Sequence, residues 1–299
     1  MSEPGGIIAP MTTEVTTRGA RTEHAPARWR WTPRGPLHLG QTLRVLGRGA
    51  EDPTCRILGE DCVWITTRWN RLPVSARFTR PAGVTGTNPL DRDVLVEAWG
   101  PGAEGWLPTA PRWVGHEDSW EDFDSSAAFA ELPHTLVRAR HEHPGLRLPA
   151  TGNLLERAVV AILEQRVTAI EAVRAYRALL RWNAEPAPGP APHGMRVPPT
   201  PEQWRRTPSW QWHRAGVDPA RSATVMRTVH RAAALERLAL DPDPARVRAA
   251  LQSIPGIGPW TAAEITQCTH GDPDGVSVYD YHLADYVCWF FDHAPGSDE

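Results

Sequence analysis

A glycine-rich turn and one aspartate carry the strongest chemical signal in this sequence. Residues 251–263 read Leu-Gln-Ser-Ile-Pro-Gly-Ile-Gly-Pro-Trp-Thr-Ala-Ala, which predicts a helix, a tight hairpin and a second helix. The backbone amides of such a hairpin, together with the start of the second helix, form an anion site that suits a phosphodiester. Asp280 follows in the next stretch of chain and supplies a carboxylate. Together the two features predict a clamp on the DNA backbone beside a group that can do chemistry on a nucleoside.

Both features also have ordinary structural interpretations. The glycines could form a plain turn between helices, and Asp280 could only cap a helix predicted from about His282 to Phe291. Helical patterns on both sides of the turn favour the DNA-binding hairpin, and the position of Asp280 after it favours catalysis. The neighbouring acids are interpreted as solvated loop or surface residues: Asp272, Asp274 and Asp285.

The charge of the chain is unevenly distributed. Its 299 residues carry a formal net charge of −3, yet residues 151–250 hold 15 Arg against 9 acids, and residues 251–299 hold 8 acids and no Arg. The arginine-rich part could lie along phosphates, whereas the acidic end does not fit that role. All 32 basic residues are Arg, so a mechanism through a lysine Schiff base is excluded.

The cysteine content and the hydropathy limit the class of protein. The four cysteines lack metal-binding spacing, so neither zinc nor an iron–sulfur cluster is predicted, and their small number fits a reducing cytosol. No apolar run reaches membrane-spanning length, and the N-terminal stretch lacks the core of a signal peptide. We expect a cytoplasmic protein, monomeric and without membrane contact.

The pattern of residue types predicts an α+β fold in two domains. Residues 1–27 are predicted as a disordered lead-in. Residues 28–124 are predicted as an N-terminal α/β domain with a small antiparallel sheet, whose strands lie near residues 61–67, 74–79 and 93–99. Residues 125–299 are predicted as an all-α domain.

Capping residues indicate where the predicted helices begin. Two pairs have the spacing of a capping box, and two aspartates precede a first-turn proline: Asn153 with Glu156, Thr168 with Glu171, Asp218 and Asp243. A proline-rich loop is predicted from Asn183 to Pro199.

The chemical motifs resemble one known superfamily. The residues at 254–262, followed by Asp280 and Tyr281, resemble the helix-hairpin-helix DNA glycosylase superfamily, and within it the alkylpurine (3-methyladenine) branch. Residues 161–168 resemble the helix that carries a glutamine and an intercalating residue in that superfamily. The β-rich N-terminal part resembles the extra two-layer α/β domain of that branch. The resemblance implies flipping and hydrolytic excision of alkylated purines from duplex DNA in base excision repair, without strand cleavage.

The resemblance assigns roles to individual residues. Asp280 would stabilise the oxocarbenium-like sugar or orient water, and one carboxylate suffices because an alkylated purine is already cationic and leaves as a neutral base. Trp260 and Tyr281 would flank the base, although Trp260 could equally be a core residue. The residues that would contact DNA are Gly256, Ile257, Gly258, Thr261, Gln165 and Arg166, of which Arg166 could equally be an ordinary surface arginine.

The resemblance also bears on cofactors and on strand cleavage. In bifunctional members a lysine follows the hairpin and forms a Schiff base, but Trp260 takes that place here, which predicts a monofunctional enzyme. No organic cofactor is expected, while a structural Na⁺ or K⁺ could be held by the main-chain carbonyls of Gln252, Ile254 and Ile257. Glu264 departs from the pattern, since members often have an aromatic residue there.

The sequence departs from the superfamily again after Asp280. Members continue with further helices that close the site, whereas this sequence ends in a polar segment, so we expect a domain without its closing C-terminal helix. An exposed apolar patch is then expected at Tyr286, Val287, Trp289, Phe290 and Phe291. The alternatives to the alkylpurine enzyme are a catalytically inactive or truncated helix-hairpin-helix DNA-binding protein and a glycosylase for another lesion, such as uracil or a mismatched base.

Overall fold

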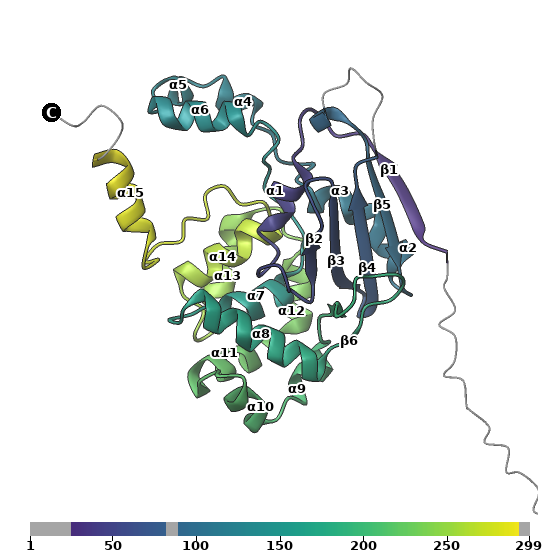
Figure 1. Ribbon diagram of the computed structural model, residues 1–299. Helices are drawn as coiled ribbons and strands as arrows, with labels where there is room; N and C mark the ends of the chain where they lie inside the picture. The colour runs from purple at the N-terminus through teal and green to yellow at the C-terminus, as the bar shows by residue number, and fades with distance from the viewer. Residues whose placement is uncertain (1–24, 82–88, 293–299) are drawn as a thin grey trace, which may run out of the picture.

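The computed structural model describes residues 25–81 and 89–292, and its N-terminal half is built on an antiparallel sheet (Figure 1). The strands are β1 (Ala27–Trp31), β2 (Cys55–Ile57), β3 (Cys62–Trp69), β4 (Leu72–Thr79) and β5 (Val94–Trp99), in the spatial order β1-β5-β4-β3-β2. Strands β3, β4 and β5 confirm the three predicted strands, whereas β1 and β2 are additional. Ala27 was predicted to end the lead-in but is the first residue of β1, and residues 1–24 lie outside the described residues.

The two faces of the sheet are buried against different parts of the chain. Alternation along β3 directs Val63 and Ile65 into a core shared with α1 (Leu39–Arg44), α2 (Ala103–Trp106) and α3 (Ala110–Trp113). Trp64 faces the other way and stacks on Trp99, with 5.1 Å between the ring centroids. There the proline-rich segment packs on the sheet through Ala187, beside the short pairing of β6 (Glu185–Pro186) with β7 (Arg196–Val197).

Three short helices form a group apart from both the sheet and the main helical body (Figure 1). They are α4 (Glu121–Asp124), α5 (Ala127–Ala130) and α6 (His134–Glu142), and none of their residues is buried. Arg140 holds the group together, because it donates to both carboxylate oxygens of Asp124, at 3.0 and 2.8 Å, and lies 4.5 Å from the Trp120 ring centroid. Edge-on ring contacts of Phe123 with Trp120 and Phe129 add to these bonds, so the group is held by polar, cation–π and aromatic contacts although none of its residues is buried.

The remaining helices build a second core. They are α7 (Leu154–Leu163), α8 (Ala169–Asn183), α9 (Pro201–Arg205), α10 (Ser209–Arg214), α11 (Pro219–His230), α12 (Ala232–Leu238), α13 (Pro244–Gln252) and α14 (Pro259–Thr269). The last helix, α15 (Leu283–Asp292), supplies none of the residues of this core. Fully buried side chains of α7, α8 and α14 meet in this core, among them Ile162, Leu179 and Ile265. No helix of the described ranges is long and apolar enough to cross a membrane. The α+β class is confirmed, with one core within residues 37–114 and the other within residues 154–265.

Most of the predicted helix starts are confirmed by their hydrogen bonds. Thr168 and Glu171 form a complete capping box at the start of α8. The side chains of Asp218 and Asp243 accept from the first free amides of α11 and α13. These caps satisfy amides that have no acceptor within their own helix, so a local sequence signal is enough to find them.

The predicted capping box at the start of α7 is wrong. Asn153 makes no capping hydrogen bond and instead donates to Thr67 Oγ1 of β3 at 2.5 Å. It also donates to Glu156 Oε2 at 3.3 Å, and Glu156 faces the junction between sheet and helices. The Asn153 side chain therefore bonds to the sheet and not, as its local sequence predicts, to the free amides of α7.

Candidate nucleic-acid interface and active site

The predicted hairpin is present between α13 and α14, and its two glycines have different tasks. Gly256 has φ +99°, and a Cβ there would overlap the Thr224 hydroxyl of α11. Gly258 is the extended N-cap of α14, and a Cβ there would meet nothing within 4 Å. Gly256 is therefore required by internal packing, whereas Gly258 leaves the backbone open to an approaching group. The first amides of α14, at Trp260 and Thr261, begin at this open point.

Two side chains from other helices fasten the hairpin. Gln165, at the end of α7, donates to the Gly256 carbonyl at 2.9 Å and to Thr261 Oγ1 at 2.8 Å. Arg227 of α11 donates from Nε to the Pro255 carbonyl at 2.9 Å. The structure thus brings the predicted residues Gln165, Gly256 and Thr261 together, but it uses the Gln165 amide to brace the hairpin.

Arg166 directly follows Gln165 and is exposed beside the hairpin. Its φ is +53°, a left-handed conformation that is uncommon for a residue with a Cβ. The backbone therefore turns sharply at this residue, where the chain leaves α7.

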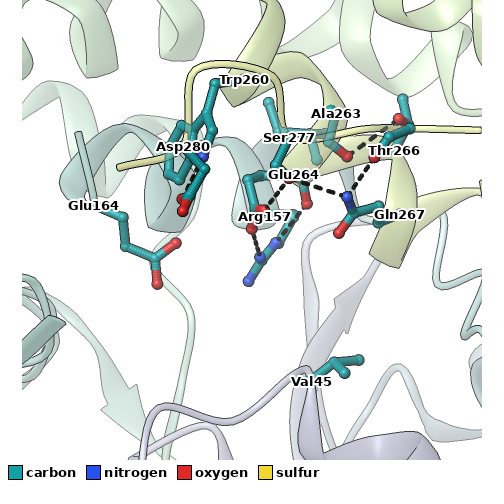
Figure 2. A network of polar contacts seen from close by, with 12 residues as sticks. Val45, Arg157, Glu164, Trp260, Ala263, Glu264, Thr266, Gln267, Ser277 and Asp280 are labelled. Atoms are coloured by element: carbon teal, nitrogen blue, oxygen red, sulfur yellow. Dashed lines mark hydrogen bonds and ion pairs between the residues drawn. The ribbon is translucent and has the colours of Figure 1, made fainter. Parts of the chain in front are cut away.

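Asp280 and Trp260 form a hydrogen-bonded pair (Figure 2). The Trp260 indole nitrogen donates to Asp280 Oδ2 at 3.1 Å. The other carboxylate oxygen accepts from the amides of His282 at 2.9 Å and Leu283 at 3.0 Å. These donors, the His282 amide first and the Trp260 indole after it, hold the pKa of Asp280 below its ordinary value. Asp280 therefore caps the start of α15 with one oxygen and presents a fixed carboxylate beside Trp260 with the other.

The loop that carries Asp280 is fixed by buried polar contacts. Asp272 is 2% exposed, is ion-paired with Arg248 and accepts from Thr266 Oγ1 at 2.7 Å. The prediction that Asp272 is a solvated acid is wrong, because the residue anchors the loop to α13 and α14. Tyr279, just before Asp280, has φ +66°, so the loop also holds an uncommon backbone conformation next to the candidate catalytic group.

An ion pair joins α14 to α7 near Trp260 and Asp280. Arg157 of α7 donates to the Glu264 carbonyl at 3.0 Å and to the Glu264 carboxylate at 3.1 Å (Figure 2). The second oxygen of that carboxylate accepts from Ser277 Oγ at 2.6 Å. At the position where the resemblance leads one to expect an aromatic, Glu264 therefore holds Arg157 in place.

A second carboxylate also faces this region. Glu164 lies at the C-cap of α7, and its Oε1 is 2.6 Å from Arg48 Nε, which comes from the loop after α1. Burial raises the pKa of Glu164, and the charge of Arg157 acts in the opposite direction. Figure 2 shows Glu164, Arg157 and Asp280 around one region.

Sequence reasoning missed both ion pairs. The partners Arg157 and Glu264 are 107 residues apart, so no local spacing connects them. One signal was available, since Arg157 interrupts the apolar stripe of α7 and yet is almost fully buried. A charged residue in such a place requires a partner.

Tyr281 and α15 are exposed. The Tyr281 side chain is 86% exposed and its ring lies edge-on against His282, so the structure does not bring it together with Trp260. The expected apolar patch is present on α15, which extends away from the helical body (Figure 1). Its exposed members are Tyr286, Val287, Trp289 and Phe291, whereas Phe290 is half-buried.

A well-formed cavity of the described residues lies elsewhere. It has a volume of about 230 Å³ and is lined by residues of β3, α7 and α12, among them Thr67, Glu156 and Leu235. None of the predicted site residues lines it. The candidate site therefore rests on the contacts around Asp280 and the hairpin, and the cavity belongs to the junction of the two cores.

Comparison with known proteins identifies the fold. No family model matches the sequence, and no match is found among curated proteins. The chain is similar to a 3-methyladenine DNA-glycosylase from Archaeoglobus fulgidus, with a TM-score of 0.69 and 14% identity over 89% of this chain and 88% of that chain.

It is also similar to the 8-oxoguanine glycosylase/lyase of Clostridium acetobutylicum at 11% identity. The TM-score is 0.61 for the apo-form, over 87% of this chain and 83% of that chain. It is 0.59 for the complex with double-stranded DNA containing cytosine opposite to 8-oxoG, over 87% and 81%. The chain thus shares the fold of these DNA glycosylases, which confirms the fold that the resemblance implied.

Proposed function

We propose that the protein is a DNA glycosylase that flips an alkylated purine out of duplex DNA and hydrolyses its N-glycosidic bond. The observation that carries the proposal is the combination of a hairpin open at Gly258 with the Asp280 carboxylate, which Trp260 holds at 3.1 Å. The fold shared with a protein named as a 3-methyladenine DNA-glycosylase supports the choice of alkylpurines.

Asp280 supplies the charge that the reaction needs. As the base departs, positive charge develops on the sugar, and a fixed carboxylate stabilises that charge or orients water toward C1′. The lowered pKa keeps Asp280 ionised in neutral and mildly acidic solution, so it is not a proton donor to the leaving base. This suits a purine alkylated at N3 or N7, because such a base leaves neutral without being protonated.

Trp260 and the amino-acid composition support two further parts of the proposal. The indole face can stack on a cationic base, an interaction worth about 0.5–2 kcal/mol. The chain contains no lysine, so the Schiff base through which a lysine side chain leads to strand cleavage cannot form. The stacking supports a cationic base as substrate, and the absence of lysine supports a monofunctional hydrolase.

The hairpin is the proposed contact with the DNA backbone. The amides at the start of α14 and the glycine open to solvent suit a phosphate, and such contacts do not depend on base sequence. The Ile254 carbonyl accepts from the Ile257 amide at 2.9 Å, and within the described part of the chain the carbonyls of Gln252, Ile254 and Ile257 accept no side-chain hydrogen bond. Arg227 and Gln165 instead bond to the carbonyls between them, those of Pro255 and Gly256. This donor set fits Na⁺ or K⁺, which would add positive charge beside the phosphate.

The test is the release of 3-methyladenine and 7-methylguanine from methylated duplex DNA. We expect Asp280→Asn to lower the rate at least about 100-fold while DNA binding is retained, because the charge that stabilises the transition state is lost. Asp285→Asn is the matched control, since this residue lies in the first turn of α15 and is exposed. Undiminished release by Asp280→Asn would remove Asp280 from the mechanism.

A second candidate function is DNA binding without catalysis. Two observations favour it: Asp280 caps α15, and Tyr281 is exposed, so neither residue needs a catalytic role to explain its position. Its signature would be salt-sensitive binding to duplex DNA with no base released from any lesion. A panel that adds uracil, 8-oxoguanine and mismatched bases to the alkylated substrates separates it from a glycosylase of another specificity.

A further inference from the structure

The ion pair of Arg157 with Glu264 uses only two of the three guanidinium nitrogens. Nε donates to the Glu264 carbonyl at 3.0 Å and Nη2 to the Glu264 carboxylate at 3.1 Å. Within the residues that the structure describes, Nη1 has no acceptor, and in Figure 2 this nitrogen points away from Glu264. The contacts with Glu264 thus fix the guanidinium, while Nη1, which is not closed off from solvent, can still donate to a ligand.

Glu164 provides an acceptor that is fixed in a similar way. Arg48 contacts its Oε1 at 2.6 Å, and the Glu164 side chain remains 21% exposed. Arg48 is itself held, since its amide donates to Asp52 at 2.7 Å and its carbonyl accepts from Arg177 at 3.0 Å. The carboxylate is therefore positioned by the N-terminal core, while its second oxygen keeps its capacity to accept hydrogen bonds.

The two groups are close without being bonded to each other. The charge of Arg157 acts on the pKa of Glu164, yet the described residues show no ion pair between them. Figure 2 shows Glu164 on the Asp280 side of the Arg157 guanidinium. Because the sugar of a flipped nucleotide would lie at Asp280, a base held there would meet the carboxylate first and the guanidinium further along its edge.

This order of acceptor and donor matches the Watson–Crick edge of guanine. Guanine presents its N2 amino group and its N1–H as donors, and O6 as an acceptor at the far end of the edge. A carboxylate accepts from both donors at once, and a guanidinium N–H donates to O6. Adenine has no amino group at C2 and carries a donor at position 6, which would face the guanidinium and leave both partners unpaired.

We propose that Glu164 and Arg157 read the Watson–Crick edge of the flipped base, so that the site takes guanine-derived lesions, 7-methylguanine among them, in preference to 3-methyladenine. The inference rests on the proposed glycosylase function and specifies its substrate class. Glu164 is the better residue to change, because Arg157 is buried and tied to Glu264, whereas Glu164 is partly exposed.

The experiment measures both bases released from one sample of methylated duplex DNA, each as a rate enhancement over spontaneous loss. We expect the wild-type chain to give the larger enhancement for 7-methylguanine. Glu164→Gln should lower that enhancement about tenfold or more, since an amide N–H then faces the donors of guanine. The enhancement for 3-methyladenine should change less than about threefold. Glu142→Gln, an exposed change on α6, is the matched control.

Each outcome decides between the inference and its alternatives. An equal loss of both activities in Glu164→Gln, with melting temperature and DNA binding unchanged, would overturn the role of Glu164 in specificity. A larger enhancement for 3-methyladenine in the wild-type chain would overturn the preference for guanine. Both results leave the proposed function intact, whereas release of neither base by the wild-type chain would remove that function itself.

Discussion

Two residues beside the proposed site have a left-handed backbone conformation that favours glycine. Arg166 has φ +53° and Tyr279 has φ +66°, and neither side chain is buried, so packing does not explain the conformation. Such residues cost of order 1–3 kcal/mol each and tend to gather at functional sites. Arg166 lies next to the hairpin brace Gln165, and Tyr279 lies next to Asp280. The strained backbone therefore lies directly beside Gln165 and Asp280, two side chains whose positions the site requires.

Arg166 can be tested without disturbing this backbone. Glycine accepts a positive φ, so we expect Arg166→Gly to leave the free energy of unfolding within about 1 kcal/mol of the wild type. If the arginine fills the space left by a flipped nucleotide, release of alkylated bases should fall about tenfold, as for the loss of one charged contact. Base-release kinetics and chemical denaturation measure the two effects.

Arg166→Ala serves as the companion variant, because it removes the same side chain but keeps a Cβ on the left-handed backbone. Equal losses of activity in the two variants would assign the effect to the guanidinium. A loss in Arg166→Ala alone would assign it to the backbone, and unchanged activity in both would make Arg166 an ordinary surface residue.

At the scale of elements, α13, the hairpin and α14 act as one unit whose two glycines can be separated by experiment. Gly256→Ala should lower the free energy of unfolding by at least about 2 kcal/mol, because φ is +99° and the new Cβ would overlap the buried Thr224. Denaturation with urea at constant pH measures this loss. A change below about 0.5 kcal/mol would show that the hairpin and α11 separate easily.

Gly258→Ala should have the opposite profile. The new methyl group meets no protein atom within 4 Å, so the fold should lose only about 0.5–1 kcal/mol, the cost of alanine at an N-cap. The same methyl group would lie between the hairpin and a phosphate, and the affinity for duplex DNA should fall. Unchanged affinity at low and moderate salt would mean that DNA does not approach the hairpin here.

The elements differ in how far the sequence predicts them, for a physical reason. The caps at Thr168, Asp218 and Asp243 are local, since each side chain bonds to amides two or three residues away, and the sequence predicts them correctly. The cap at Asn153 fails because its side chain finds Thr67, 86 residues earlier. Strand β1 was missed for the same reason, because its partner β5 is its neighbour in the sheet but lies far away in the sequence.

In the site, too, the sequence predicts the local features and misses the long-range contacts. The hairpin glycines and Asp280 belong to contiguous motifs and could be named from residue types and spacing. The ion pairs of Arg157 with Glu264 and of Arg48 with Glu164 join helices to distant segments, and Arg48 comes from the N-terminal core. No periodic pattern marks such pairs, since each partner alone resembles an ordinary helix or loop residue.

At the scale of the whole molecule, the junction between the two cores contains acids that are not ion-paired. Asp52 is fully buried after α1 and accepts from the Thr54 amide at 2.6 Å and the Cys55 amide at 3.0 Å. Burial raises the pKa of Asp52. Burial also raises the pKa of Glu156 on α7 to about 8, and the charge of Asp52 adds to this effect. The junction is therefore most favourable when Glu156 is neutral.

This arrangement predicts that the stability of the protein falls as the pH rises. The folded state binds more protons than the unfolded state between the ordinary pKa of a glutamate, near 4.5, and about 8, so the free energy of unfolding decreases over that window. Glu156→Gln keeps the shape of the neutral carboxyl group and removes the titration. Its advantage over the wild type should grow by about 4 kcal/mol between pH 5 and pH 8.5.

Chemical denaturation at both pH values measures the difference between the two proteins, and taking that difference cancels the contribution of titrating groups that do not interact with Glu156. Glu142→Gln, an exposed change that is 62% open to solvent, should show no such dependence on pH. If the gap between Glu156→Gln and the wild type were the same at pH 5 and pH 8.5, Glu156 would be ionised in the folded protein, and the junction would have to supply it with a positive partner. Arg68, whose charge already opposes the raised pKa of Glu156, would be that partner, so Arg68→Met should then destabilise the wild type more than Glu156→Gln at pH 8.5.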